Sequence, residues 1–468
     1  MTTRTATDSV GPLGADAFEL ANALLHGEIP IAIYGLGKVG LPMAAVYAHR
    51  TGNVIGVDID QHRVDQINQG QTPFSHEPGL DSLLESAIKT NELSATTDAT
   101  TASETARVHI IIVPVMLSQR PTDATASSDG YVKHRGELAD LTALDAAVRS
   151  VGNGLTRGDL VILESTVPPG TTDSMVTPLL ERISGIERGT FGVAFSPERV
   201  SSGRAITDIS GAYPRVVGGI DAASTNAASG VYRGLTDSKM ITVTDARTAE
   251  VVKLFEGIYR DVNIALANEL ARTTDDLRVD VREAISAANT QPYCDIHTPG
   301  AGVGGHCIPV YPHLFSQAVE ADTPLIQMAR YVNDGMPMFV VSKLVNEFKS
   351  IGKELTETTV GVLGLTYRPD IPELRNSPAE PIITSLIDDG VSVVGVDPAL
   401  DDPDVFGVPR VEPEMLQGLN PDGVIIVTNH EAFSEIEWSG YDDLIIVDAR
   451  DILTQTMHRT YTIGRGYR

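Results

Sequence analysis

The chain has 468 residues, 42% of them hydrophobic and 21% charged, which is typical of a globular protein of about three domains and not of a fibrous or disordered chain. There are 35 Lys and Arg against 62 Asp and Glu, so the formal net charge is −27 at pH 7, and such acidity argues against binding to nucleic acids or anionic membranes. Only two cysteines and no apolar run of about 18 residues occur, so we expect neither a secreted nor a membrane-spanning protein and predict a cytoplasmic one.

The acidity also suggests a hypothesis about the protein's environment. Self-repulsion of this size would strain a fold in dilute buffer, whereas at molar salt the screening length falls to about 3 Å. We therefore hypothesise a salt-adapted, halophilic cytoplasm. The alternative is an acidic enzyme from an ordinary cell.

The first half of the chain has the pattern of a parallel sheet with crossover helices. Residues 1–28 are expected to form a tail or a short helix. An apolar run at 29–34 is followed at once by glycines, a helix-like segment at 41–49 and a second apolar run at 53–59, which is a strand–turn–helix–strand unit. Further strands are expected at 108–113, 160–163 and 191–195, and a Ser-, Thr- and Asp-rich loop at 117–129.

A helical region follows. Residues 248–271 have few helix breakers and helix-spaced apolar residues, which predicts one long helix. Residues 325–349 are also helical in pattern, but Gly335 and Pro337 predict a break. The strand pattern then restarts and indicates a second, smaller parallel α/β domain, with apolar runs at 359–365, 392–396, 423–427 and 443–447.

A glycine motif after the first predicted strand indicates a dinucleotide site. Gly35 would allow the tight turn, Gly37 the approach of a pyrophosphate and Gly40 the packing of helix on strand. Asp58 ends the next strand at about the offset expected for an acid that bonds the ribose hydroxyls, and its charge favours NAD over NADP. The alternative, an ordinary Gly-rich turn, does not account for Asp58.

A second glycine-rich segment, 300–309, places four glycines just before His306 and Cys307. A thiol on such a loop beside a histidine can shift toward thiolate and act as a nucleophile. A small buried hydrophobe is the alternative, and the residues alone leave both open. Cys294 lacks the glycine setting and is expected to be structural.

Three other residues suit a carbonyl or acyl reaction, each with an ordinary alternative. Thr166 follows a predicted strand, where ligands bind in parallel sheets, or belongs to a Pro-rich turn. Glu198 also follows a strand, as a general base or as a solvated loop acid. Lys253, on the long helix, is either a donor to a developing oxyanion or an exposed lysine paired with Glu256.

In this order the motifs resemble those of the UDP-sugar 6-dehydrogenases, in the UDP-glucose/GDP-mannose dehydrogenase superfamily. The resemblance covers roughly residues 29–455 and is closest to the UDP-N-acetylmannosamine/UDP-N-acetylglucosamine branch. It rests on the glycine motif, Ser165-Thr-Val-Pro-Pro-Gly-Thr, Ser196-Pro-Glu-Arg199, Tyr259-Arg-Asp-Val-Asn-Ile-Ala265, Gly304-Gly-His-Cys-Ile-Pro309, Gly364-Leu-Thr-Tyr-Arg-Pro-Asp370 and Arg375-Asn-Ser-Pro378.

The resemblance implies a four-electron oxidation of a UDP-N-acetylhexosamine at C6, with UDP-N-acetyl-D-mannosamine as the expected substrate. The C6 alcohol loses hydride to NAD, Cys307 attacks the aldehyde to give a thiohemiacetal, and a second NAD accepts hydride to leave a thioester that water hydrolyses to the uronate. Lys253 would stabilise the oxyanion, Glu198 assist water or proton transfer, and Thr166 position the reacting group.

The resemblance also implies the remaining site residues and the architecture. No metal is expected, and the protein is expected to be a homodimer or larger homo-oligomer. Expected NAD contacts are Gly35, Gly37, Lys38, Val39, Gly40, Asp58, Arg63, Pro114 and Thr166. Expected substrate contacts are Glu198, Arg199, Lys253, Arg260, Asn263, Gly304, Gly305, His306, Tyr367 and Arg375. The expected fold is α/β, with an extension at 1–28, a Rossmann NAD-binding domain at 29–238, a helical dimerisation region at 239–350 carrying Lys253 and Cys307, and a Rossmann-like UDP-binding domain at 351–468.

Four positions depart from the family pattern. Many relatives have Asn at the position of Gly257 and Asp at that of Tyr311, while Tyr293 replaces an arginine and Ser202 a second glutamate of some relatives. These changes concern the hydrogen bonds around the water and the oxyanion. Three alternatives therefore stay open: UDP-N-acetylglucosamine or UDP-glucose as substrate, a two-electron β-hydroxyacid-type dehydrogenase, and a non-catalytic nucleotide-sugar binder.

Overall fold

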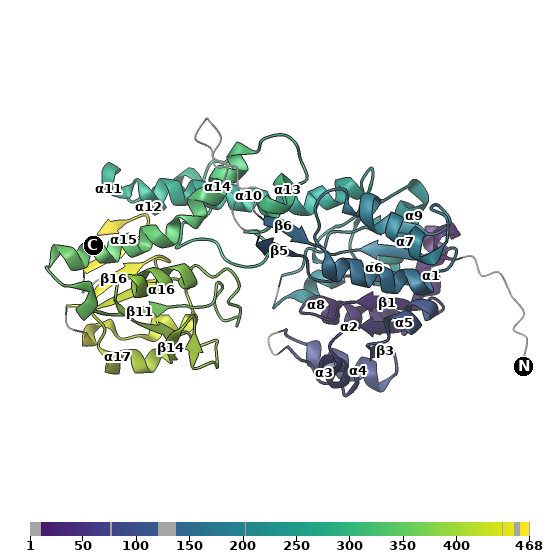
Figure 1. Ribbon diagram of the computed structural model, residues 1–468, viewed down its shortest axis with the longest axis horizontal. Coiled ribbons are helices and arrows are strands. Elements are labelled where there is room, and N and C mark those ends of the chain that lie inside the picture. Colours follow the sequence, from purple (N-terminus) through teal and green to yellow (C-terminus); the bar gives the residue numbers. More distant parts are fainter. Residues whose placement is uncertain are drawn as a thin grey trace, which may run out of the picture. The chain divides into compact units, whose positions relative to one another are not determined.

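Figure 1 shows a computed structural model, which describes residues 11–74, 77–119, 137–201, 203–441, 443–453 and 459–467. The chain divides into two compact units. The first contains the described residues up to Phe255 together with Leu314–Glu320, and the second contains Glu256–His313 and the residues from Ala321 onward. The domain boundaries expected at 28, 238 and 350 stay predictions.

The first unit is built on an eight-stranded sheet with the order β10-β9-β8-β7-β4-β1-β2-β3, in which only the β8–β9 pair is antiparallel. Strands β2 and β4 lie on opposite sides of β1, and such a reversal opens a crevice at the carboxyl ends of the strands, where ligands bind. The strands are β1 (Ile31–Tyr34), β2 (Val54–Val57), β3 (Leu93–Thr96), β4 (Val108–Ile111), β7 (Leu160–Leu163), β8 (Gly192–Phe195), β9 (Arg215–Gly219) and β10 (Met240–Thr242).

Helices cover both faces of this sheet (Figure 1), so its central strands β1 and β4 are buried at every position and are mostly apolar. In β1, Ile31 and Ile33 join the core beneath α2 (Gly40–Thr51) and α9 (Ala222–Leu235). Ala32 and Tyr34 join the opposite core beneath α6 (Thr142–Gly154) and α7 (Thr177–Ser184). The predicted strands at 29–34, 53–59, 108–113, 160–163 and 191–195 are therefore confirmed.

The expected short helix before the first strand is α1 (Ala17–Leu25), and residues 1–10 lie outside the described part. The Asp16 carboxylate accepts the Phe18 N–H at 2.8 Å and caps the helix. Helix α1 packs on α9, where a Cβ at Gly230 would lie 2.9 Å from Cα of Ala17. Three further helices of this unit are α3 (Gln61–Asn68), α4 (Leu80–Lys89) and α5 (Ala99–Thr105).

The prediction of a loop at 117–129 is wrong for its first three residues, which belong to a strand. Strand β5 (Met116–Gln119) pairs antiparallel with β6 (Glu137–Asp140), while residues 120–129 lie outside the described part. Polar residues predicted a loop here, but pairing satisfies the backbone groups of each strand that face the other strand. The Ala139 N–H, on the ribbon's other edge, donates to Oε1 of Gln317 at 3.1 Å.

The helical predictions are confirmed. The long helix is α10 (Ala246–Arg272), and the break falls at Gly335, between α14 (Pro324–Asp334) and α15 (Met336–Ser350). Pro337 lies in the first turn of α15, where the missing N–H costs no helical hydrogen bond. Shorter helices are α11 (Thr274–Leu277), α12 (Val281–Ala288) and α13 (Tyr311–Ser316). None of the described helices combines the length and apolarity needed to cross a bilayer.

The second unit contains the second α/β sheet, ordered β13-β14-β12-β11-β15-β16-β17-β18 and antiparallel only at its two edge pairs. The four strands expected from apolar runs are β11 (Thr359–Leu363), β12 (Ser392–Val396), β15 (Gly423–Ile426) and β16 (Ile445–Asp448). Sequence analysis missed the short strands of the two outer pairs, namely β13 (Asp404–Val405), β14 (Val408–Val411), β17 (Arg459–Thr462) and β18 (Gly466–Tyr467). Helices α15 and α16 (Ala379–Asp388) cover one face, and α17 (Leu416–Leu419) lies on the other.

Candidate active site

The glycine motif forms the turn between β1 and α2. Gly35 has φ +101°, and a Cβ there would collide with the carbonyl oxygen of Ile112. A Cβ at Gly40 would collide with the carbonyl oxygen of Gly35, so both glycines are required by the backbone itself. Around Gly37, in contrast, nothing lies within 4 Å of the Cβ position. The turn thus leaves open space at the helix N-terminus, as a bound pyrophosphate needs.

Asp58 lies at the end of β2, beside this turn. Its Oδ2 accepts the Leu36 N–H at 2.8 Å and an Arg63 N–H at 3.0 Å, while Oδ1 accepts the Asp60 N–H at 3.0 Å. The carboxylate is therefore fixed in direction and keeps lone pairs for ribose hydroxyls. These residues fit an adenine dinucleotide such as NAD.

The other expected cofactor residues lie around the same crevice. Lys38 and Val39 precede α2 in the glycine turn. Ser165 joins the ends of β4 and β7, because its Oγ donates to the Val113 carbonyl and accepts the Val113 N–H, both at 2.8 Å. Pro114 and Thr166, the residues that follow Val113 and Ser165, are thereby held at the edge of the sheet where ligands bind.

A buried charged cluster lies beneath the strand ends of the first unit. Arg215 pairs with Glu164 at 2.5 Å and with Oε2 of Glu198 at 3.3 Å, and its Nε donates to Oγ of Ser196 at 2.9 Å. The Tyr232 hydroxyl donates to Glu164 at 2.5 Å. Burial raises the pKa of Glu164 to about 8, although Arg215 opposes the shift.

This cluster fixes the predicted catalytic residues of the first unit. The Lys253 ammonium donates to the backbone carbonyl of Glu198, so the structure brings these two residues together. Oε1 of Glu198 is buried and makes no hydrogen bond with any described residue, which leaves an acceptor for a water or a substrate hydroxyl. Arg199 donates to the Pro214 carbonyl at 3.0 Å.

Sequence analysis missed the supports of this cluster. Arg215 lies 51 positions after Glu164 in the chain, and only the pairing of β7 with β8 and of β8 with β9 joins them. The one available signal was Glu164 itself, a carboxylate at the end of an apolar run.

Cys307 lies in the second unit, beside its chain neighbour His306. The His306 imidazole bonds the Cys307 thiol, and its Nδ1 lies 3.2 Å from Oε1 of Glu373. Both partners raise the pKa of His306, to about 10, so the ring carries a positive charge at neutral pH. Glu373 is a second residue that sequence analysis missed.

The glycines before Cys307 pack against protein. A Cβ at Gly304 would overlap Cβ of Tyr367, and one at Gly305, where φ is +95°, would lie 3.0 Å from the same ring. The Gly305 N–H donates to the carbonyl of Arg375 at 2.9 Å, and the Asn376 amide donates to the Gly305 carbonyl at 2.8 Å. The structure thus brings together His306, Cys307, Tyr367 and the backbone of Arg375.

Two predicted substrate residues lie on α10. Arg260 is exposed. The Asn263 amide donates to the Asp295 carbonyl at 2.6 Å and accepts the His297 N–H at 2.9 Å, so it fixes a neighbouring loop. The exposed Arg375 side chain lies on the loop after β11. Substrate contact by these three residues stays a prediction.

Most of the sequence matches the three domain models of one dehydrogenase family. Residues 29–236 match the NAD binding domain of the UDP-glucose/GDP-mannose dehydrogenase family, residues 247–335 its central domain and residues 361–455 its UDP binding domain. The chain belongs to this family. The predicted fold, dehydrogenase class and NAD cofactor are thereby confirmed.

Individual relatives are similar over nearly their whole length. A UDP-N-acetyl-D-mannosamine dehydrogenase of Pyrococcus horikoshii is 36% identical over 91% of this chain and 96% of its own. An NDP-N-acetyl-D-galactosaminuronic acid dehydrogenase of Ralstonia solanacearum is 34% identical over 90% of this chain and 95% of its own. A solved structure of UDP-D-ManNAc dehydrogenase from Pyrococcus horikoshii has a TM-score of 0.82 at 34% identity, covering 94% of this chain and all of that one.

The departures from the dehydrogenase pattern have definite places in the structure. Gly257 lies on α10 and Tyr311 begins α13. The Tyr293 side chain is 94% exposed. Ser202 lies outside the described residues. Within the described part, no group of three or more His, Cys, Asp or Glu side chains is arranged to hold a metal ion.

Proposed function

We propose that the protein oxidises the C6 alcohol of UDP-N-acetyl-D-mannosamine to the carboxylate, with two NAD consumed per sugar and Cys307 as the nucleophile. The observation that carries this proposal is the position of the Cys307 thiol beside the charged His306 ring in a chain with an NAD-binding domain. A two-electron dehydrogenase has no use for a nucleophilic thiol, whereas a four-electron oxidation needs one to hold the aldehyde.

The chemistry divides among four residues. Thr166 and Lys253 orient the C6 hydroxyl, whose proton passes to solvent water as the aldehyde forms. The Cys307 sulfur adds to the aldehyde to give a thiohemiacetal, and its oxidation leaves a thioester. Glu198 then accepts a proton from the water that cleaves the C–S bond, which releases the carboxylate and restores the thiol. NAD, when bound, accepts the two hydrides that leave C6.

Lys253 is suited to the oxyanion of the thiohemiacetal and of the hydrolysis step. Its ammonium already donates to the Glu198 carbonyl, which holds the charge in place before the reaction. The Glu198 carboxylate is held by Arg215 through one oxygen, while the other oxygen is the buried acceptor described above. The water-activating role of Glu198 rests on that oxygen.

We also propose a homodimer or larger homo-oligomer. Helices α10 and α14 are joined by the buried ion pair of Arg330 with Asp261 at 2.6 Å. They expose apolar side chains that a second copy would cover, namely Tyr259 (55%), Leu266 (47%), Leu325 (68%) and Tyr331 (69%). Neither cysteine forms a disulfide, and a nucleophilic thiol stays reduced in a reducing compartment, so the cytoplasm is the proposed location.

The test is stoichiometric. The protein is incubated in molar KCl with NAD and, separately, with UDP-N-acetylmannosamine, UDP-N-acetylglucosamine, UDP-N-acetylgalactosamine and UDP-glucose. We expect two NADH per uronate, with UDP-N-acetylmannosamine preferred, and no uronate from Cys307→Ser. One NADH per product with an active Cys307→Ser would indicate a two-electron dehydrogenase. Tight UDP-sugar binding without NADH would indicate a non-catalytic binder.

The galacto epimer is included because of the Ralstonia relative, which is almost as similar to this chain as the Pyrococcus one. Preferred turnover of UDP-glucose would contradict the assignment to the N-acetylhexosamine branch.

A further inference from the structure

Glu373 lies on the loop of residues 364–377, which follows β11 in the second α/β sheet. Its Oε1 is 3.2 Å from Nδ1 of His306, and its Oε2 accepts the Tyr367 hydroxyl at 3.3 Å. The Glu373 side chain is 12% exposed and the His306 side chain 44%. The carboxylate is therefore largely withdrawn from water, while the imidazole retains access to solvent.

The charges around His306 favour its protonated form. The groups that face it are the Cys307 thiol and the Glu373 carboxylate, and Arg368 lies beyond them, next to Tyr367. An imidazolium beside a cysteine favours the thiolate, so the proton of Sγ is held on the ring. The carboxylate stabilises that imidazolium in the same way that a third group orients the base of a catalytic triad.

Backbone contacts fix the distance between Glu373 and His306. The Tyr367 N–H donates to the Glu373 carbonyl at 3.1 Å and closes the loop. The two hydrogen bonds of Gly305 with residues 375 and 376 join the loop to the segment that carries His306. Because these contacts bracket Glu373 on both sides, its carboxylate reaches His306 without depending on a flexible chain.

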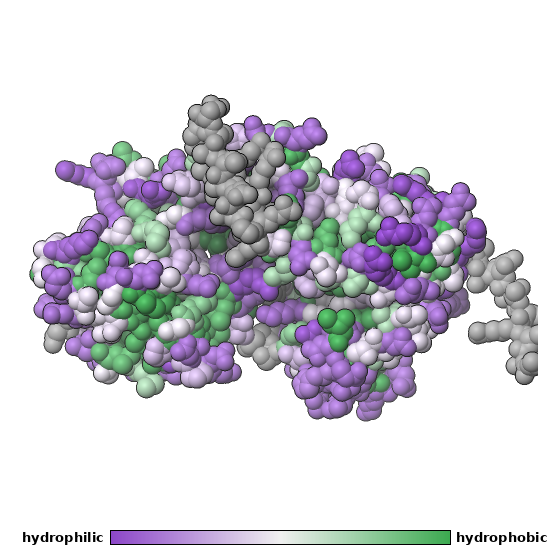
Figure 2. Space-filling view, viewed as in Figure 1, coloured by the Kyte–Doolittle hydropathy of each residue, from purple (hydrophilic) through white to green (hydrophobic). Residues whose placement is uncertain are grey.

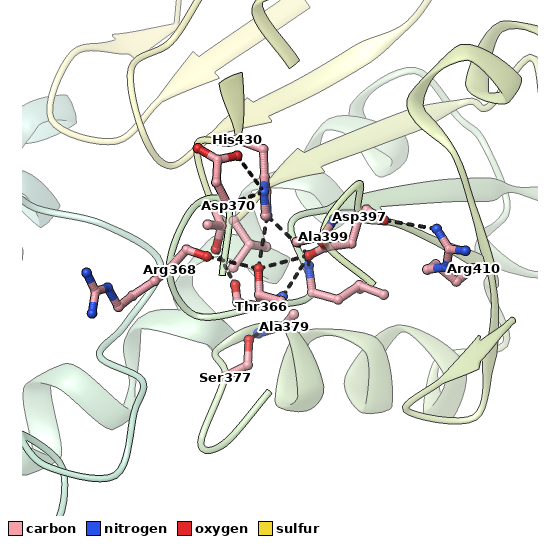
Figure 3. Close-up of polar contacts among 12 residues, drawn as sticks. Thr366, Arg368, Asp370, Ser377, Ala379, Asp397, Ala399, Arg410 and His430 are labelled. Atoms are coloured by element: carbon pink, nitrogen blue, oxygen red, sulfur yellow. Dashed lines mark hydrogen bonds and ion pairs between the residues drawn. The ribbon is translucent and has the colours of Figure 1, made fainter. Parts of the chain in front are cut away.

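The base of the loop is anchored in the sheet, as Figure 3 shows. Oδ2 of Asp397, at the end of β12, accepts the Thr366 N–H at 2.8 Å. Buried His430 lies 2.9 Å from Oγ1 of Thr366 through Nε2, and its Nδ1 accepts the Asp370 N–H at 3.1 Å. In the first sheet the corresponding strand ends with Asp58, which faces the crevice. In the second sheet Asp397 likewise accepts backbone N–H groups of the following loop, those of Leu365 and Thr366, and His430 adds a further contact.

We propose that Glu373 is a positioning residue that acts through His306 to keep Cys307 in the thiolate form. This rests on the proposed role of Cys307 as nucleophile. Neither the thiohemiacetal step nor its proton balance changes, because the proton removed from Sγ is held by His306 until the thioester is hydrolysed. A purely structural Glu373 would support the loop and leave the thiol unchanged.

The test measures the ionisation of Cys307 directly, without catalysis. In the full-length protein carrying Cys294→Ser, the rate of iodoacetamide alkylation of Cys307 is followed by mass spectrometry from pH 5 to 10. We expect an apparent thiol pKa below the ordinary value of about 8.5. Glu373→Gln should raise it by about one unit, so that the pH at which alkylation reaches half its maximal rate rises by the same amount. His306→Gln should raise it further.

Glu380→Gln is the matched control, because Glu380 is an exposed acid in the first turn of α16 in the same unit. It should leave the alkylation profile unchanged. A folded Glu373→Gln with the parental profile would overturn the proposal. If Glu373→Gln does not fold, Glu373→Asp decides instead: its shorter carboxylate should raise the apparent pKa of the thiol by a smaller amount, and a parental profile would overturn the proposal.

The two proposals fail separately. If Cys307→Ser still forms uronate, the nucleophile assignment is wrong, whatever the thiol pKa. If Cys307→Ser is inactive but the Glu373 and His306 variants keep the parental alkylation profile, the nucleophile stands and the positioning role of Glu373 is wrong.

Discussion

The ring of Tyr311 lies against Gly257, so two departures from the family pattern are in contact with each other. A Cβ added to Gly257 would overlap Cδ2 of Tyr311 and lie 3.1 Å from its Cγ and Cε2. The family resemblance led us to expect Asn and Asp at these positions. The tyrosine therefore requires the glycine, and the two differences form one coupled change rather than two losses.

Gly257→Asn alone should be destabilising, because the added side chain displaces the buried Tyr311 ring. Overpacking of this kind costs typically about 1–3 kcal/mol in the free energy of unfolding. Adding Tyr311→Asp should recover part of that loss, which a double-mutant cycle of denaturant unfolding measures. Gly418→Asn is the control, because nothing lies within 4 Å of a Cβ at that helical glycine. Additive effects of the two substitutions would contradict the coupling.

Asp58→Asn should weaken the preference for NAD over NADP. The amide retains an acceptor for the Leu36 N–H but removes the charge that repels a 2′-phosphate. We expect the ratio of the two dissociation constants, measured by calorimetry, to fall about tenfold or more, which corresponds to about 1.4 kcal/mol. Asp60→Asn is the control, because Asp60 is a nearby acid that caps α3 and either residue caps well. Equal ratios in the two variants would show that the Asp58 charge does not select the cofactor.

Glu164 should make the free energy of unfolding fall as the pH rises, which is the opposite of what a salt-bridged carboxylate does. Burial raises its pKa from 4.5 to about 8, so the folded state holds a proton that the unfolded state releases. The resulting stabilisation is complete below about pH 4.5 and is lost as pH rises through about 8. The advantage in melting temperature of the parent over Glu164→Gln should therefore shrink between pH 5 and pH 8.5.

The matched control for that measurement is Glu104→Gln, which changes an exposed acid in the same unit and should shift the melting curve equally at each pH. A difference between the parent and Glu164→Gln that grows with pH would mean that Glu164 is ionised and gains from Arg215. That outcome would reverse our assignment of the proton.

Salt should stabilise the protein. The net charge is −27, and exposed acids such as Asp65, Asp81 and Glu85 lie on α3 and α4, in a region whose surface is strongly hydrophilic in Figure 2. Screening of their repulsion predicts a melting temperature that rises steeply from low to molar KCl. Sucrose stabilises without screening charge, so it serves as the control. An unchanged midpoint in KCl would contradict the halophile hypothesis.

The features predicted from sequence are those encoded by neighbours in the chain. The turn from Gly35 to Gly40 and the strand that ends at Asp58 are local patterns with fixed spacing, so their arrangement follows from the sequence. The two residues of the pair Glu164–Arg215 are 51 positions apart in the chain, and those of His306–Glu373 are 67 apart. No periodic pattern in the sequence predicts either contact. They exist only once strands pair and the loop after β11 folds back.

The prediction of a loop from residue 117 onward was wrong for a related reason. Met116–Gln119 is too short to stand out from the Ser-, Thr- and Asp-rich segment that follows it, and it forms a strand by pairing with β6. The same holds for β17 and the edge strand β18, whose partners supply the backbone hydrogen bonds that their composition does not predict.

The return of residues 314–320 to the first unit has a consequence for biosynthesis. Phe315 packs edge-on against Phe255 at 5.6 Å, and Gln317 accepts the Ala139 N–H. When residues 11–255 have left the ribosome, residues 314–320, which complete the first unit, have therefore not yet been synthesised. Part of the second unit must emerge first, so a fragment ending at Phe255 should be a poor substitute for the native NAD-binding unit.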